Sequence, residues 1–261
     1  MTEPSLLCDV GANGVARLTL NRPEVKNAFD AALIGALTER VAALSQDEAV
    51  RVIVITGSEQ TFCAGADLHM MKAVASFSEA ENMAEARRLA DMLRTIYEAP
   101  KPVVARVNGA AIGGGAGLVA ASHIAVGADT AVFAFSEVRL GLIPAAISPF
   151  VLQAIGSRAA SRLFVTAERF GADAAVAAGL LHMAVPGAEL DAAVDGVVSN
   201  LLKCGPAAQT EARRLVRDFG GAPVSEAMLE DAAGRIAKIR ATAEGRDGMT
   251  AFLEKRKPNW A

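Results

Sequence analysis

Two short, mainly apolar runs limit the folds open to this chain more than any other feature of the sequence. They span residues 52–55 and 103–107, and the segment 79–97 between them has the length and spacing of a helix that stops before Pro100. A third run, 15–20, alternates apolar and polar residues as a half-buried strand does. Short buried strands separated by helices predict an α/β protein with crossover connections.

The rest of the chain predicts further strands and helices. Asp30 is an expected N-cap for a helix that reaches about Ser45, with an apolar face formed by Leu33, Leu37, Val41 and Leu44. Further short strands are expected at 124–126 and 132–135. Further helices are expected at 149–155, 158–165, 173–178, 210–218 and 225–242. Gly205-Pro206 is the expected boundary between a core of residues 1–204 and a helical region of residues 205–261.

Composition and charge favour a folded intracellular protein. Of the 261 residues 52% are hydrophobic and 21% charged, and the net charge of −3 argues against binding to nucleic acid or to an anionic membrane. Cys8, Cys63 and Cys204 show no pairing pattern, and residues 1–5 do not resemble a signal peptide, so we expect a cytoplasmic location. The charge-free segment 107–128 is rich in glycine and is expected to be buried rather than to span a membrane.

Two loops of small residues follow the two buried strands. They cover residues 62–68 and 108–118, and each leads from a strand into an expected helix start. Small side chains let a ligand approach the backbone, and the first N–H groups of a helix have no internal acceptor. The pair of loops therefore predicts an oxyanion hole made of two backbone N–H groups, although tight helix packing is an alternative use of the glycines.

A dinucleotide-binding fingerprint is a competing interpretation of the second loop. Residues 115–120 match G-x-G-x-x-A, and Glu137 follows at about the distance of the acidic residue in that motif. Residues 108–114 separate the motif from its strand, which a true fingerprint does not show. A nicotinamide-dependent oxidoreductase is therefore the least favoured function.

Glu137 is the expected acid or base. It stands between two segments without charged residues, 107–128 and 140–157. If Glu137 is buried there, loss of solvation should raise its pKa toward the range that proton transfer near neutral pH requires. The alternative is a structural carboxylate that pairs with Arg139 or caps a helix.

Other polar residues are weaker candidates. Asp67 is expected to cap a helix, Ser148 suits either a substrate contact or a turn, and Cys63 is expected to be a small buried residue. The histidines have no metal-ligand spacing, so no metal site is expected; they are His69, His123 and His182.

These motifs together resemble the crotonase superfamily of enoyl-CoA hydratases and isomerases. The segments that carry the resemblance are 21–28, 62–68, 107–115, 136–144 and 252–257. The resemblance implies a spiral of ββα turns with a C-terminal helical region for assembly into a homotrimer or a dimer of trimers. It also implies an acyl-CoA thioester as substrate, with coenzyme A as part of the substrate and no separate cofactor.

The resemblance implies roles for particular residues. The N–H groups of Ala66 and Gly114 would bind the thioester oxygen, and Glu137 would be the catalytic carboxylate. Residues expected to line the path of the substrate are Lys26, Asn27, Ala28, Ala64, Ala66, Asp67, Leu68, His69, Gly113, Gly114, Gly117 and Pro144. Gly117 stands where hydratases of the family commonly carry a second glutamate, so their two-carboxylate mechanism does not transfer directly.

Three functions remain open at this point. The first is hydration of a 2-enoyl-CoA. The sequence of residues 136–151 resembles the corresponding segment of hydratases of methylglutaconyl-CoA and isohexenylglutaconyl-CoA. Space freed at Gly117 would suit such a branched or carboxylated chain. The second function is isomerisation of a double bond by the single Glu137. The third is a non-catalytic acyl-CoA-binding scaffold.

Overall fold

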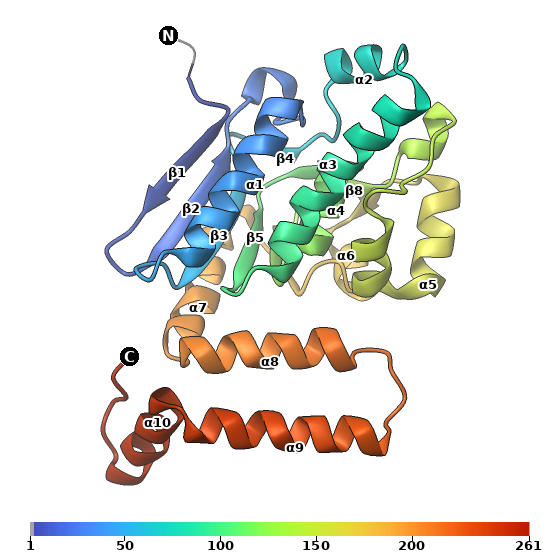
Figure 1. The fold of residues 1–261 in the computed structure, drawn as a ribbon. Coiled ribbons are helices and arrows are strands. Elements are labelled where there is room, and N and C mark those ends of the chain that lie inside the picture. Colours follow the sequence, from blue (N-terminus) through green and yellow to red (C-terminus); the bar gives the residue numbers. More distant parts are fainter. Residues whose placement is uncertain (1–2, 261) are drawn as a thin grey trace.

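The larger of two β-sheets contains most of the strands predicted from the sequence (Figure 1). The computed structural model describes residues 3–260, and within them this sheet has the strand order β1-β2-β3-β5-β7-β10. The bounds are β1 Leu6–Val10, β2 Val15–Leu20, β3 Val52–Gly57, β5 Val103–Val107, β7 Ile124–Ala128 and β10 Met183–Val185. All neighbours pair in parallel apart from β1, which runs antiparallel to β2.

A smaller sheet lies beside the first and shows how the chain winds. Its strands, in spatial order, are β4 Thr61–Cys63, β6 Ala110–Ile112, β8 Val132–Ala134 and β9 Phe170–Gly171. Each of β3, β5 and β7 in the larger sheet is followed directly by β4, β6 and β8 in the smaller one. Helices follow each pair, with bounds α2 Leu68–Val74, α3 Glu79–Glu98, α4 Gly114–Ala121 and α5 Ser148–Thr166. This repetition is the expected spiral of ββα turns.

Glycine is required where the chain passes from one sheet to the other. A Cβ atom on Gly57 would collide with the carbonyl oxygen of Thr61, and one on Gly109 would collide with that of Gln60. The first contact lies within one turn of the spiral, whereas the contact of Gly109 with Gln60 joins successive turns through their backbones. This close contact holds the loops after β4 and β6 next to each other.

Strand β3 is buried on both faces, which explains its uninterrupted apolar sequence. Ile53 and Ile55 face the main core, which also contains residues of α1 (Ala31–Gln46) and α3. Val52 and Val54 face a second cluster together with α7 (Leu190–Leu202). Parallel strands covered by helices on both sides show this composition.

The helices predicted from apolar spacing and caps are confirmed. Asp30 accepts a hydrogen bond from Leu33 N at 2.8 Å at the start of α1, whose four expected core residues are all buried. The two helices expected near 149–155 and 158–165 form one element, α5, with a kink at Gly156, where φ is 69°. α6 (Ala172–Ala178) matches the helix expected at 173–178.

The C-terminal helices form a separate layer below the rest of the protein in Figure 1. They are α8 Pro206–Phe219, α9 Glu226–Ala241 and α10 Ala243–Glu254. Arg213 and Thr210 attach α8 to the end of α3, because Arg213 donates to Tyr97 O at 2.8 Å and Thr210 donates to Pro100 O at 2.8 Å. The division of the chain into units at residue 205 stays a prediction. Within residues 3–260 no helix combines the length and apolar composition of a membrane span.

Candidate active site

The loop after β4 exposes a backbone N–H at Ala66. Phe29 N donates to Gly65 O at 2.7 Å, and Asp67 N donates to Phe29 O at 2.8 Å, so Phe29 and Ala66 form a parallel bridge. Successive N–H groups of an extended chain point in opposite directions. The N–H of Ala66 therefore points away from Phe29, and Ala66 itself is exposed.

The loop after β6 presents a second N–H, that of Gly114, which is the first residue of α4. Gly113 is its N-cap with φ at 51°, and Gly113 N donates to Ala134 O at 2.8 Å. As the first N–H of the helix, Gly114 N has no acceptor within α4. A Cβ atom on Gly65 would lie 3.8 Å from Gly114 N, so the two loops are in direct contact.

Glu137 lies against the same loop. It is the first residue of a 3-10 helix, η2 (Glu137–Leu140), and its Oε1 lies 3.0 Å from the position that a Cβ on Gly113 would occupy. Its Oε2 is buried and has no hydrogen-bond partner among residues 3–260. Burial raises the pKa of this carboxyl group above its ordinary value of 4.5. Arg139, the partner considered from the sequence, is exposed.

Gly117 does not provide the free space expected from the sequence. A Cβ atom on Gly117 would stand 2.8 Å from Cβ of Ile147 and 3.5 Å from Cδ1 of Leu93. Ile147 is 2% exposed, so its side chain fills the room beside the glycine. The expectation that Gly117 admits a bulky acyl chain is therefore wrong, because the core closes over this position.

The residues expected to line the coenzyme A path lie near the two loops but differ in exposure. Lys26 is exposed with φ at 55°, and Ala64 N donates to Lys26 O at 3.0 Å, which joins 26–28 to the first loop. Asn27 is fully buried, and its amide donates to Ser58 O at 3.0 Å and to Thr61 O at 2.7 Å. Asn27 therefore supports the loop from behind, and its proposed substrate contact stays a prediction.

Asp67 is the helix cap that the sequence favours. Its Oδ1 accepts a hydrogen bond from His69 N at 2.7 Å, and its Oδ2 pairs with Arg22 at 2.9 Å. Burial raises the pKa of Asp67, but the bonds from His69 N–H and Arg22 outweigh burial and hold that pKa below its ordinary value. Leu68 and His69 are exposed, whereas Pro144 is buried.

The surroundings of several other candidate residues give them structural roles. Burial raises the pKa of the Cys63 thiol to about 12, so Cys63 is the inert buried residue expected. His123 is partly buried, and loss of solvation lowers its pKa to about 3; its Nδ1 accepts a hydrogen bond from Val103 N at 2.8 Å. Ser148 donates to Ala145 O at 2.9 Å within a turn. Residues 115–120 lie inside α4, which excludes the dinucleotide fingerprint.

A metal site is not formed by the described part of the chain. No group of three or more histidine, cysteine or acidic residues there is arranged to hold an ion.

A cavity of about 390 Å³ lies next to the first loop. Its wall includes Asp67 and His69, the apolar residues Met70, Ala73, Val74 and Phe77, and Glu85 and Arg88 from α3. Glu85 was not expected from the sequence, although it stands on the buried face of α3 at helical spacing from Leu89 and Leu93. A charged residue on an apolar helix stripe is the signal that would have identified it.

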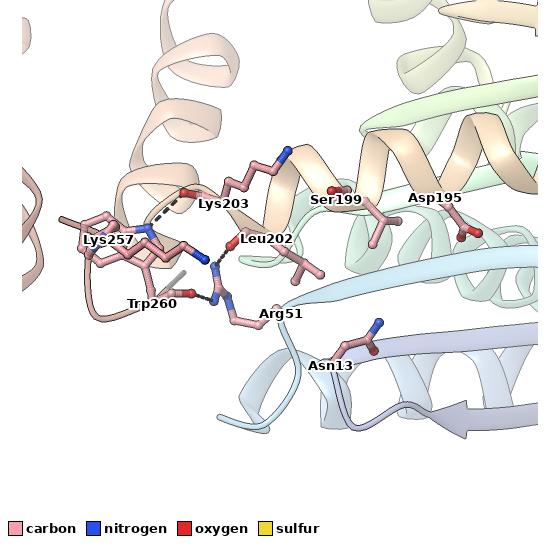
Figure 2. A pocket seen from close by; sticks show the side chains of 10 residues that line it. Asn13, Arg51, Asp195, Ser199, Leu202, Lys203, Lys257 and Trp260 are labelled. Atoms are coloured by element: carbon pink, nitrogen blue, oxygen red, sulfur yellow. Dashed lines mark hydrogen bonds between the residues drawn. The ribbon is translucent and has the colours of Figure 1, made fainter. Parts of the chain in front are cut away.

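A larger cavity, about 860 Å³, lies away from Glu137, with residues of α7 and of the tail 257–260 in its wall (Figure 2). The guanidinium of Arg51 donates to Trp260 O at 3.2 Å and to Leu202 O at 3.4 Å (Figure 2). It also donates to Cys204 O at 2.8 Å. The indole of Trp260 donates to Lys203 O at 3.2 Å. Arg51 thus ties the end of α7 and the C-terminal tail to the strand below them.

Comparison with known proteins gives the class and then the family. The structure of an enoyl-CoA hydratase from Shewanella pealeana matches with a TM-score of 0.95 and 36% identity, over 98% of this chain and 96% of that one. A crotonyl-CoA hydratase of Syntrophomonas wolfei is 32% identical over 94% of both chains. A trans-2-decenoyl-[acyl-carrier-protein] isomerase of Streptococcus mutans is 30% identical over 95% of both chains.

The fold and the paired loops define a crotonase-type enzyme. The profile of the family described as enoyl-CoA hydratase/isomerase matches residues 11–261, and the chain belongs to this family.

Proposed function

We propose that the protein adds water to the double bond of a 2-enoyl-CoA thioester. The observation that carries this proposal is the position of the Glu137 carboxylate, whose Oε1 lies 3.0 Å from the Cβ position of Gly113. Gly113 precedes Gly114, whose N–H has no acceptor within α4. Negative charge develops on the thioester oxygen when water attacks the β-carbon. Two backbone N–H groups, those of Ala66 and Gly114, stabilise that oxygen by hydrogen bonds.

The proton balance follows from a single carboxylate. The oxygen of the attacking water bonds to the β-carbon while Glu137 accepts a proton from that water. The electrons of the double bond move to the thioester oxygen, which gives an enolate. The enolate then takes the proton from Glu137 at the α-carbon, which regenerates the carboxylate. The raised pKa brings the proton affinity of Glu137 closer to that needed at neutral pH. No separate cofactor takes part, since coenzyme A belongs to the substrate.

A branched or glutaconyl-type acyl chain is the specific substrate proposed. Its support is the similarity of residues 136–151 to hydratases of such chains. The argument from space at Gly117 does not contribute, because Ile147 fills that space.

Isomerisation of a double bond is the second candidate. Moving a double bond needs one group that removes a proton and returns it at another carbon, and Glu137 alone meets this need. The relative from Streptococcus mutans is named an isomerase, although its acyl carrier differs.

Ultraviolet absorbance separates these candidates. Incubation with a 2-enoyl-CoA should remove the conjugated enone absorbance if the enzyme hydrates. Incubation with a 3-enoyl-CoA should create this absorbance if it isomerises. Tight coenzyme A binding without turnover of either substrate would instead favour the non-catalytic scaffold and contradict the proposal.

We further propose that the protein assembles as a homotrimer or a dimer of trimers in the cytoplasm. The C-terminal helices carry large apolar side chains that are exposed in a single chain, namely Val216, Leu229, Ile236, Met249, Phe252 and Leu253. A surface of this kind favours association with further chains. The molar mass in solution, measured by light scattering, tests the assembly, and a monomer would contradict it.

A further inference from the structure

Glu85 holds a buried carboxylate oxygen that the protein itself leaves without a partner. Glu85 is 7% exposed, and its Oε2 pairs with Nη1 of Arg88 at 2.9 Å. The other oxygen, Oε1, is buried and accepts no hydrogen bond from any group in residues 3–260. A buried acceptor without a donor is unfavourable, so a site of this kind is suited to a ligand that supplies one.

The position of Glu85 relates it to the proposed oxyanion hole. On the same face of α3, Leu89 Cδ2 lies 3.9 Å from the Cβ position of Gly114, and Leu93 Cδ1 lies 3.5 Å from that of Gly117. Four residues advance a helix by about 6 Å. Glu85 therefore stands about one turn beyond the N-terminus of α4, on the side where a bound thioester would lie.

The cavity of about 390 Å³ lies beside the loop that carries Ala66. Its wall includes Asp67 and His69, which follow Ala66 in the chain, the apolar side chains of Met70 and Val74, and Glu85. An acyl chain that extends from Ala66 into this cavity would contact its apolar wall and Glu85.

The charges of the cavity favour a neutral chain end over an acidic one. Arg22 is paired with Asp30 at 3.0 Å and with Asp67 at 2.9 Å, and Arg88 is paired with Glu85. The lining thus contains two cations and three carboxylates, with both cations already engaged. A carboxylate on the substrate would be repelled, whereas a hydroxyl would satisfy Oε1 of Glu85.

We propose that Glu85 is a specificity-determining residue that selects acyl chains bearing a neutral hydrogen-bond donor, such as a hydroxyl group, near their distal end. This proposal rests on the proposed function. It keeps the branched chain as a substrate, provided that the chain bears a neutral donor, and it argues against the glutaconyl-type chain, whose distal carboxylate the cavity would repel. The hydroxyl donates to Oε1 while Arg88 keeps its bond to Oε2.

Matched substrates test the proposal. A 2-enoyl-CoA, its ω-hydroxy derivative and its ω-carboxy derivative are compared over a series of chain lengths by kcat/KM. At the best length the hydroxy substrate should be preferred over the plain one by about tenfold, or about 1.4 kcal/mol, as expected for a bond to a charged group. The carboxy substrate should be the poorest.

Variants link this preference to Glu85. In Glu85→Leu the preference for the hydroxy chain should disappear, and in Glu85→Gln, which keeps an acceptor of similar shape, it should be reduced. The matched control is Glu98→Leu, an exposed position on the same helix, where the preference should persist. An unchanged preference in Glu85→Leu, no preference in the wild type, or preference for the carboxy chain would overturn the proposal.

Binding of saturated acyl-CoA analogues separates this inference from the proposed function. Calorimetry should show tighter binding of the ω-hydroxy analogue than of the plain one, with no reaction required. If enoyl-CoA is turned over but neither assay shows the preference, the inference alone is wrong. If nothing is turned over but the binding preference is found and depends on Glu85, the proposed reaction is wrong and the assignment of Glu85 stands.

Discussion

Ile147 occupies the space beside Gly117, with its Cβ 2.8 Å from the point where a side chain on Gly117 would begin. The resemblance to the crotonase superfamily implies that Gly117 stands at the position of a second glutamate that hydratases of this superfamily commonly use. Because Ile147 packs against Gly117, a glutamate at position 117 would require a change at position 147 as well.

Restoring the second glutamate should accordingly need a paired substitution. Gly117→Glu alone forces a side chain into Ile147 and Leu93, and overpacking of this kind costs about 1–3 kcal/mol before the burial of a charge is added. Gly117→Glu with Ile147→Gly should recover much of that loss. Chemical denaturation of both variants measures the free energies of unfolding, and equal stability of the two would contradict the packing argument.

Glu137 should be needed for turnover far more than for binding. Glu137→Gln keeps the shape of the side chain but cannot transfer the proton, so kcat should fall by roughly 10²–10⁴. Affinity for a saturated acyl-CoA should change little. Steady-state kinetics and calorimetry on the same preparation check both expectations, and near-normal kcat in this variant would reject Glu137 as the catalytic acid and base.

The raised pKa of Glu137 also has a consequence for stability. Because the folded state holds this proton more tightly than the unfolded state does, the contribution of Glu137 to stability is lost as pH rises from 4.5 through its higher folded pKa. Glu137→Gln removes this effect. Its melting temperature should therefore match that of the wild type near pH 4 and exceed it at pH 7.5, and a constant difference across this range would show that burial does not perturb the group.

Gly114→Pro removes the N–H of Gly114 and also places a carbon atom against Phe29, whose Cδ2 lies 3.2 Å from the Cβ position. Gly114 is the first residue of α4, where proline is well tolerated because the N–H there has no helical acceptor. Gly114→Pro should lower kcat by about 10²–10³, the usual cost of one oxyanion-hole donor. Gly114→Ala is the matched control, since it keeps the N–H and places a carbon at the same contact with Phe29. Equal losses in the two variants would indicate a steric effect instead.

Much of the fold follows from local patterns in the sequence. Residues 52–55 are all apolar, and residues 103–107 are apolar except for Arg106; short runs of this kind favour strands covered on both sides. Asp30 marks the start of α1. The glycine-rich loops after these strands predict backbone N–H donors, because small side chains let a ligand approach the backbone. These features depend on neighbouring residues, so a single sequence reveals them.

The parts that were missed depend on contacts between distant residues. β4 and β6 have three residues each, too few for a periodic signal, and their place is set by the contact of Gly109 with Gln60. The packing of Ile147 on Gly117 likewise joins different turns of the spiral. Nothing in the local sequence around Gly117 specifies what fills the space beside it.

Exchange of the α-proton with solvent tests the central assignment most directly, since it needs neither hydration nor isomerisation. A saturated acyl-CoA is incubated with the enzyme in D₂O and followed by proton NMR. We expect deuterium to enter at the α-carbon with the wild type, because the N–H groups of Ala66 and Gly114 stabilise the enolate and Glu137 carries the proton. Exchange that is absent in the wild type, or equally fast in Glu137→Gln, would contradict the account.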